Sequence, residues 1–213
     1  MNPYTSRIGF WAAVIATLFG LGYIVALLAT LAGVLTGPRA TFYQLAPSIV
    51  LAWSFMVLMA CILDAAPPER RIWAINGFGF ALMYAVMNSI VYFTELTVVI
   101  PRLLRNEAAS LSVLLFEPGE FLFAVNGLAY GFMSMAALFA APVFARSGLE
   151  ARVRWAMLAH GAIGPFIVAA VVWTPLQYIG ALWIVTFPTM GVLLVMLFRK
   201  AITSPNVEAS KRD

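Results

Sequence analysis

The chain has 213 residues, of which 63% are hydrophobic and 10% are charged, and its mean hydropathy is +0.94. Soluble domains carry about 45–50% apolar and about 25% charged residues, so this composition excludes a water-facing domain and predicts an integral membrane protein. The net charge of +4 is spread beside apolar segments rather than clustered, which argues against nucleic-acid binding. A single cysteine, Cys61, and a single histidine, His160, exclude a disulfide framework and haem held by two histidines.

Six apolar runs of at least 18 residues predict an all-α polytopic bundle of transmembrane helices in a single domain, residues 1–200, with a polar tail over 201–213. The first run is too long for the apolar core of a signal peptide, so we expect it to be a retained helix. The expected spans are 9–35, 45–64, 72–100, 121–145, 153–173 and 178–198.

Helix-breaking residues separate these runs. Gly37-Pro38-Arg39 is expected to end the first span, and Pro67-Pro68 follows the second. Pro101 is expected to close the third, and Thr174-Pro175 separates the fifth from the sixth.

The distribution of positive charge predicts the orientation of the bundle. With both termini on the cytoplasmic side, ten cations flank the spans inside and three outside, a clear positive-inside bias. The inner set is Arg7, Arg70, Arg71, Arg146, Arg152, Arg154, Arg199, Lys200, Lys211 and Arg212, and the outer set is Arg39, Arg102 and Arg105. We therefore expect a multi-pass protein of the inner membrane with the lipid bilayer as its surroundings, and the Arg- and Ala-rich composition points to a bacterial source.

The segment 101–120 is the only loop with a pattern of its own. Asn106-Glu107 is suited to cap a short helix through Leu111 and the apolar run 113–116, which Pro118-Gly119 would stop. Its apolar residues predict a helix on the outer surface or a shallow re-entrant segment.

The third span carries a polar stripe. Four residues spaced by four, four and three positions share one helix face: Tyr84, Asn88, Tyr92 and Glu95. Lipid would leave their hydrogen-bonding groups unpaired, so this face is expected to contact protein or a water-filled cavity. Glu95 lies near the outer boundary, and the competing interpretation is a carboxylate that extends to the headgroups or pairs with Arg102 or Arg105.

The fourth span has a matching stripe of Asn126, Tyr130 and Ser134, with Gly127 and Gly131 beside it at GxxxG spacing. One interpretation is a closely packed interface between spans three and four. The functional interpretation is that both stripes line an outward-facing cavity with Glu95 at its mouth and form a ligand-binding site.

His160, in the fifth span, precedes Pro165, which is able to kink the helix. Asp64 at the inner end of span two lies at a similar depth, so the two are candidates for a proton relay. The alternatives are a hydrogen-bonded packing role for His160 and a capping role for Asp64. Glu117 and Glu120 flank a Pro-Gly turn and are expected to be solvated.

Residues 76–83 and 126–133 have similar sequences, and they would enter the membrane from opposite sides. Inverted repeats of this kind are typical of transporters, although chance similarity between short Gly- and aromatic-rich stretches is the alternative. Nucleophile-elbow, zinc-helix, P-loop and dinucleotide motifs are all absent from the sequence. We therefore expect no catalytic residues, no metal and no cofactor.

Three segments resemble parts of small uncharacterised bacterial multi-span membrane proteins: 92–99, 128–132 and 138–144. The resemblance covers spans three and four, implies a six-helix fold and carries no activity with it.

Three functions remain open from the sequence. The polar stripes favour binding or transport of a small or amphiphilic molecule. A non-catalytic partner or regulatory subunit of another membrane protein is the second hypothesis, and a membrane-embedded enzyme is the third.

Overall fold

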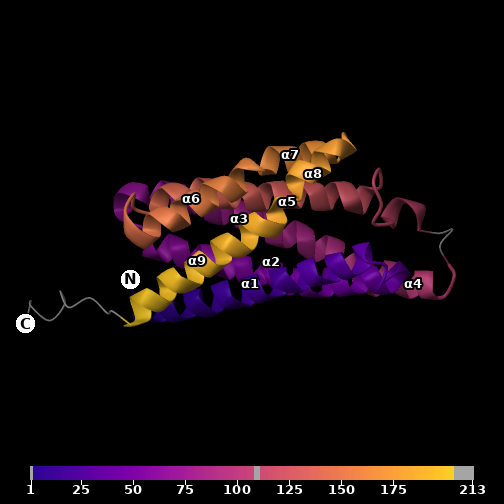
Figure 1. The fold of residues 1–213 in the computed structure, drawn as a ribbon, viewed down its shortest axis with the longest axis horizontal. Coiled ribbons are helices and arrows are strands. Elements are labelled where there is room, and N and C mark those ends of the chain that lie inside the picture. Colours follow the sequence, from indigo (N-terminus) through magenta and orange to yellow (C-terminus); the bar gives the residue numbers. More distant parts are fainter. Residues whose placement is uncertain (1, 108–110, 204–213) are drawn as a thin grey trace, which may run out of the picture.

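A computed structural model describes residues 2–107 and 111–203, and all regular structure in these two ranges is helical. Within these ranges six helical segments are long and apolar enough to cross a membrane, which confirms the predicted number of long apolar helices. They run over Pro3–Leu31, Gly37–Ala65, Pro68–Leu104, Phe121–Val143, Gly148–Ala170 and Thr174–Thr203. The segments lie side by side along one long axis, with the start of the first segment and the end of the last at one end, the termini end (Figure 1).

Helices α1 (Pro3–Leu31) and α2 (Gly37–Ala65) both begin earlier than the apolar runs suggest. The side chain of Asn2 caps α1 and Pro3 occupies its first turn, where a missing N–H costs nothing. The sequence predicts that Gly37-Pro38 ends the first span, and this prediction is wrong. Gly37-Pro38 begins α2, with Thr36 at the N-cap position, because proline is as well suited to start a helix as to follow one.

The third span comprises η1 (Pro68–Arg70), α3 (Arg71–Thr94), the π-helix η2 (Glu95–Val99) and α4 (Ile100–Leu104). Pro101 was expected to end the span, yet helical structure continues to Leu104. The wider π turn precedes Pro101 and rearranges the backbone hydrogen bonds there, so the proline falls in the first turn of α4.

The expected helix in the loop 101–120 is not found in its described part. Asn106 has a φ of 60°, residues 108–110 lie outside the described residues, and only a single 3-10 turn follows, η4 (Ser112–Leu114). Leu111 is 1% exposed and packs beneath the loop against Leu45 and Val91. The apolar residues of this loop therefore cover the interior at the end opposite the termini, the far end.

The remaining spans are α5 (Phe121–Ala140) with η5 (Ala141–Val143), then α6 (Gly148–Ala162) with α7 (Gly164–Ala170). The last comprises η6 (Thr174–Leu176), α8 (Gln177–Gly180) and α9 (Trp183–Thr203). The fifth span breaks at Ile163 next to Pro165, as the proline predicts. Helix α9 extends to Thr203, so the expected tail 201–213 begins as helix, and residues 204–213 lie outside the described residues.

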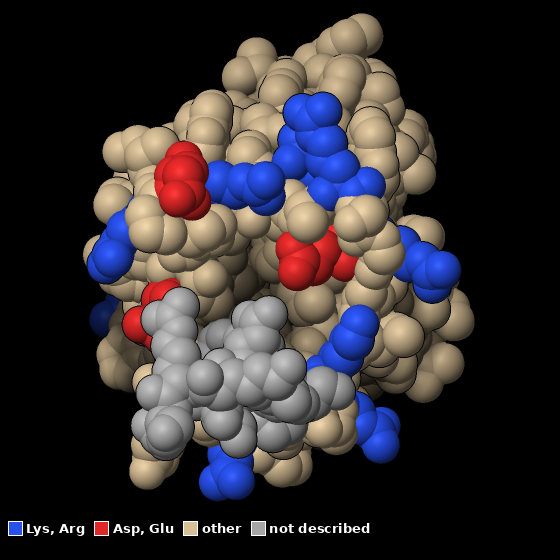
Figure 2. Space-filling model, turned by 90° about the vertical axis from the view of Figure 1, so that its left-hand side faces the viewer, with Lys and Arg blue, Asp and Glu red and all other residues tan. Residues whose placement is uncertain are grey.

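Lysine and arginine side chains gather at the termini end, which Figure 2 shows face on. The described cations of this end are Arg7, Arg70, Arg71, Arg146, Arg152, Arg154, Arg199 and Lys200. Arg39, Arg102 and Arg105 belong to the opposite ends of the same helices. The fold thus has the charge asymmetry on which the predicted orientation depends.

Candidate functional site

The polar stripe of α3 meets α5 and α9 inside the bundle. The Tyr92 hydroxyl donates a hydrogen bond to the Tyr130 hydroxyl over 3.1 Å. The Tyr130 ring lies edge-on to Tyr84 at 5.7 Å and to Trp183 at 5.8 Å between centroids. The structure therefore brings together the predicted tyrosines of spans three and four, with an aromatic residue of span six beside them.

These rings belong to a larger interior aromatic cluster, which comprises Tyr23, Phe55, Tyr84, Tyr130, Trp183 and Phe187. Trp183 stacks on Phe187 with centroids 4.9 Å apart, and Tyr23 of α1 contacts Trp183 at 5.6 Å. Phe55 of α2 packs against Tyr84 at 5.8 Å and against Phe187 at 6.4 Å. Five of the six spans thus contribute a ring to one continuous group.

Several polar atoms around this cluster are buried and have no hydrogen-bond partner within the described part of the chain. They are the Tyr84 hydroxyl, both amide atoms of Asn88, Oε1 of Glu95, Oδ1 of Asn126, Oγ of Ser134, Nε2 of His160 and Nε1 of Trp183. Leaving such an atom unpaired costs about 1–3 kcal/mol, so native interiors contain few of them. Those on Tyr84, Asn88 and Trp183 make the interior beside the aromatic rings a candidate for accepting and donating further hydrogen bonds.

Glu95 is 1% exposed and begins the π-helix. It does not lie at an open mouth, because Leu111 and Leu122 with their apolar neighbours form a second buried cluster beside Val91, Tyr92 and Val99 at the far end. Isolated π-helical turns often accompany functional residues.

One of the two arginines that were possible partners of Glu95, Arg105, is engaged elsewhere, and no ion pair of the other, Arg102, is found among the described residues. The Arg105 guanidinium binds the Glu107 carboxylate at 2.9 Å. The hydrogen bond to Arg105 lowers the pKa of the Glu107 carboxyl, and the same bond raises the pKa of Arg105. This exposed pair leaves the buried carboxylate of Glu95 without a described ion-pair partner.

The stripe of α5 is divided between two neighbours. Tyr130 contacts α3. Ser134 lies against the start of α7, where a Cβ atom added at Gly164 would be 2.7 Å from the Cβ atom of Ser134. Positions four residues apart are rotated by about 40° around a helix, so Tyr130 and Ser134 lie toward different neighbours. Gly127 and Gly131 likewise accommodate valines of the fifth span, so the GxxxG face does not pack against span three as expected.

Asp64 and His160 have different hydrogen-bond partners. The Thr5 hydroxyl of α1 donates to the Asp64 carboxylate, which is exposed at the end of α2. His160 is fully buried, and its Nδ1 lies 3.1 Å from the Thr186 hydroxyl of α9. Its ring also packs against Phe187, so His160 adjoins the aromatic cluster, while Asp64 belongs to the surface of the termini end.

The described residues also form cavities at the surface, two of which are large enough for a small molecule. One, of about 370 Å³, lies at the termini end, and the other, of about 360 Å³, is an apolar groove between α1 and α2 lined by Trp11 and Ile15. Glu117 is exposed in the loop before α5. Within residues 2–107 and 111–203 no three His, Cys, Asp or Glu side chains are placed to hold a metal ion.

Trp183 is the member of the site that sequence reasoning missed. It is 6% exposed, whereas Trp11, Trp73, Trp155 and Trp173 are all exposed, as expected of residues at a membrane interface. Trp183 has a signal in the sequence, because it lies within an apolar run away from the predicted ends of span six. A tryptophan at that depth must bury its N–H, which calls for a polar partner.

No protein-family model, curated protein or solved structure matches this chain.

Proposed function

We propose that this chain is a multi-pass protein of the cytoplasmic membrane that binds a small hydrogen-bonding or amphiphilic molecule inside its bundle and moves it across. The observation that carries the proposal is the set of unpartnered polar atoms on Tyr84, Asn88, Glu95, Asn126 and Trp183. They come from three spans, and two of the side chains, Tyr84 and Trp183, are themselves members of the aromatic cluster. Ligand sites combine these two features, because apolar walls supply contact area and a few polar groups fix orientation.

The interior site is enclosed at both ends, which favours transport over simple capture. Toward the far end lies the apolar cluster that includes Leu111. Toward the termini end, Phe55 and Phe187 pack together, and His160 contacts Phe187. A site closed on both sides corresponds to an occluded state, from which opening one end at a time would move a ligand.

Interrupted helices beside the site supply places where such opening can occur. The fifth span breaks at Ile163, and residues 181–182 separate α8 from Trp183 at the start of α9. The π-helix that begins at Glu95 interrupts the third span. Discontinuous helices next to an intramembrane site are a recurrent feature of secondary transporters.

Cysteine accessibility tests the proposal. In a background where the native cysteine is removed by Cys61→Ala, Asn88→Cys places a thiol in the interior site. Val86→Cys on the same helix, where the native side chain is 51% exposed, is the matched lipid-facing control. Only a hydrated thiol ionises and reacts quickly, so a water-soluble maleimide should label position 88 faster than position 86, by about tenfold or more.

Two further thiols calibrate sidedness in the same vesicles. Ser147→Cys is exposed at the termini end, and Glu117→Cys is exposed in the loop at the far end. We expect the reagent to reach 147 only from the cytoplasmic side and 117 only from the opposite side. The reverse result would overturn the proposed orientation without affecting the interior site.

The competing function predicts a different pattern at position 88. If the chain is a non-catalytic partner of another membrane protein, the α3–α5 interface is dry, and Asn88→Cys stays unreactive from both sides while position 147 is labelled normally. That outcome would overturn binding within the bundle.

A further inference from the structure

The surface cavity at the termini end has the composition of a ligand pocket. It measures about 370 Å³ and lies between the end of α2, the residues 67–70, the turn 143–144, the first turn of α6 and the end of α9. Volumes of about 300–1,000 Å³ are usual for small-molecule sites. The termini-end face of the molecule is hollowed near its centre (Figure 2).

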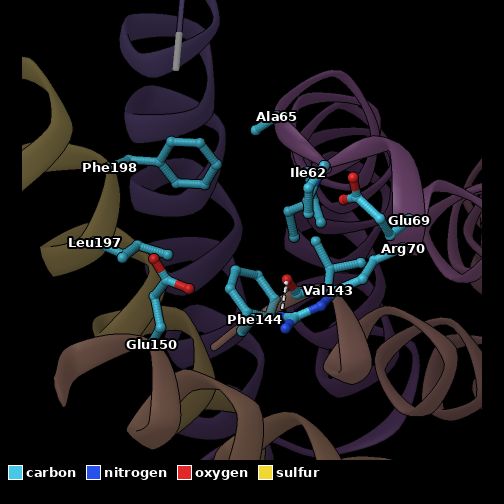
Figure 3. A pocket seen from close by; sticks show the side chains of 10 residues that line it. Ile62, Ala65, Glu69, Arg70, Val143, Phe144, Glu150, Leu197 and Phe198 are labelled. Carbon is cyan, nitrogen blue, oxygen red and sulfur yellow. Dashed lines mark hydrogen bonds between the residues drawn. The ribbon is translucent and has the colours of Figure 1, made fainter. Parts of the chain in front are cut away.

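One side of this termini-end pocket is apolar and rigid. Phe198 is 1% exposed and Ile62 is similarly buried, and both line the cavity together with Phe144 and Val143. The Phe198 ring packs so closely on the backbone of Gly9 in α1 that a Cβ there would overlap it. The phenyl rings of Phe144 and Phe198 come from two different elements and both point into the pocket (Figure 3).

The polar side is held in place by hydrogen bonds to the backbone. Nη1 of Arg70 donates to the Val143 carbonyl over 3.2 Å, which uses one of the five guanidinium N–H groups. Oε2 of Glu150 accepts the Ala145 N–H over 2.7 Å and leaves the second oxygen available. Glu150 lies across the pocket from Glu69 and Arg70 (Figure 3).

No ion pair within residues 2–107 and 111–203 involves Glu69, Arg70 or Glu150. A purely anionic ligand would meet two carboxylates in this pocket, and a purely cationic ligand would meet the guanidinium. A molecule that carries both charges satisfies all three side chains, because charge-assisted hydrogen bonds can form at each end.

We propose that the termini-end pocket binds a zwitterion with an apolar portion. Its anionic group binds Arg70, its ammonium group lies between Glu69 and Glu150, and its apolar portion packs on Phe144 and Phe198. Two sources offer this chemistry: a free apolar amino acid and the headgroup of an aminophospholipid. The inference is independent of the interior site, with which this pocket shares no residue.

Calorimetric titration of the full chain in detergent tests the proposal with two zwitterionic probes, L-phenylalanine and dihexanoylphosphatidylethanolamine. Saturable binding of L-phenylalanine alone identifies an amino-acid site. A headgroup site is identified if only the phosphatidylethanolamine binds, or if it binds more tightly than L-phenylalanine. Dihexanoylphosphatidylglycerol lacks the ammonium group and is expected to bind at least about tenfold more weakly than its ethanolamine counterpart, a difference of about 1.4 kcal/mol. Failure of both zwitterions to bind at millimolar concentration would overturn the proposal.

Paired substitutions distinguish a ligand site from a structural role of the same residues. Glu150→Gln removes the charge and keeps an acceptor for the Ala145 N–H, whereas Arg70→Gln removes the guanidinium charge and shortens the side chain. Each takes one charge out of the pocket and should weaken binding of the zwitterion by about tenfold or more. The neighbouring exposed Arg71→Gln is the matched control and should bind like the wild type.

A cavity-filling variant protects the test against loss of folding. Ala65 lines the pocket, so Ala65→Phe should abolish binding without changing any charge. Unchanged affinity in Ala65→Phe, or in both Gln variants, would show that the zwitterion binds elsewhere and would overturn the assignment.

Discussion

The α1–α9 interface and the α3–α5 interface are both contacts between antiparallel helices, yet they differ in whether the polar groups buried between them are hydrogen-bonded. Between α1 and α9, Gly9 and Gly20 accommodate the rings of Phe198 and Phe187, and Gly191 accommodates Thr17. The Thr17 hydroxyl is satisfied, because it donates to the Ala13 carbonyl over 2.7 Å. The first interface is thus closely packed along these glycines, and the Thr17 hydroxyl buried in it is hydrogen-bonded.

Between α3 and α5 the contact is equally close at one point, where Gly77 lies against the Ala136 carbonyl and Ala140. Farther along the same helices, the polar atoms of Tyr84 and Asn88 are buried without partners. Proteins tolerate such local costs mainly where function requires them. The comparison indicates that α1–α9 stabilises the fold, whereas α3–α5 gives up stability to keep hydrogen-bonding capacity inside the bundle.

The largest expected effect is on the closely packed interface. Gly191→Leu forces a side chain into the volume of Thr17, and overpacking of this kind costs up to about 3 kcal/mol of unfolding free energy. Equilibrium unfolding in mixed micelles measures it. Gly79→Leu on α3 is the matched control, because a Cβ there meets nothing within 4 Å. Equal losses in the two variants would mean that α1–α9 packing has no special role.

The second prediction concerns Asn88 and has the opposite sign. Asn88→Leu removes two unpartnered polar atoms from a fully buried position, so we expect the ligand-free protein to gain about 1–3 kcal/mol. Asn76→Leu on the same helix is the control, because that amide is exposed and donates to the Ile72 carbonyl. A loss of stability in Asn88→Leu under the same unfolding conditions would contradict the contrast between the two interfaces.

Two tyrosines in α3 allow the same substitution to be compared within the site. Tyr92→Phe breaks the hydrogen bond to Tyr130 and should cost about 1 kcal/mol. The Tyr84 hydroxyl makes no hydrogen bond of ordinary geometry, although it lies near the Asn88 amide and the Tyr130 hydroxyl, so Tyr84→Phe should cost less than Tyr92→Phe. Thermal melts of both variants in one detergent compare them, and identical losses would argue that the two hydroxyls are in equivalent surroundings.

The smallest effect is expected at the surface, where the Arg105–Glu107 pair contrasts with the buried Glu95. Because Arg105 lowers the pKa of Glu107, the pair stabilises the fold above the ordinary glutamate pKa, and this contribution is lost as the pH falls through the lowered value. The melting temperature of the wild type should therefore fall slightly more than that of Glu107→Gln when the pH is lowered from neutral to acidic. High salt should remove the difference, because the pair is exposed.

Much of the helical architecture could be predicted from apolar runs and prolines, and the errors have local causes. Gly37-Pro38 was assigned to the end of one helix when it begins the next, because proline fits either place. The continuation past Pro101 depends on the π turn at Glu95–Val99, which no residue pattern announces. The stripe over Tyr84, Asn88 and Tyr92 was found because helical periodicity places these residues on one face.

The sequence by itself determined that six apolar helices form, which residues interrupt them, and that the faces of α3 and α5 carry polar groups, since these properties depend on composition and on spacing along one helix. Only the tertiary structure decided which faces meet. In the folded chain Gly127 and Gly131 pack against valines of the fifth span, and Trp183 makes a ring contact with Tyr130. Thr5 is hydrogen-bonded to Asp64, and Thr186 is hydrogen-bonded to His160. Partner choice depends on the rotation and crossing of whole helices, and a rotation of one residue, about 100°, changes every contact on a face.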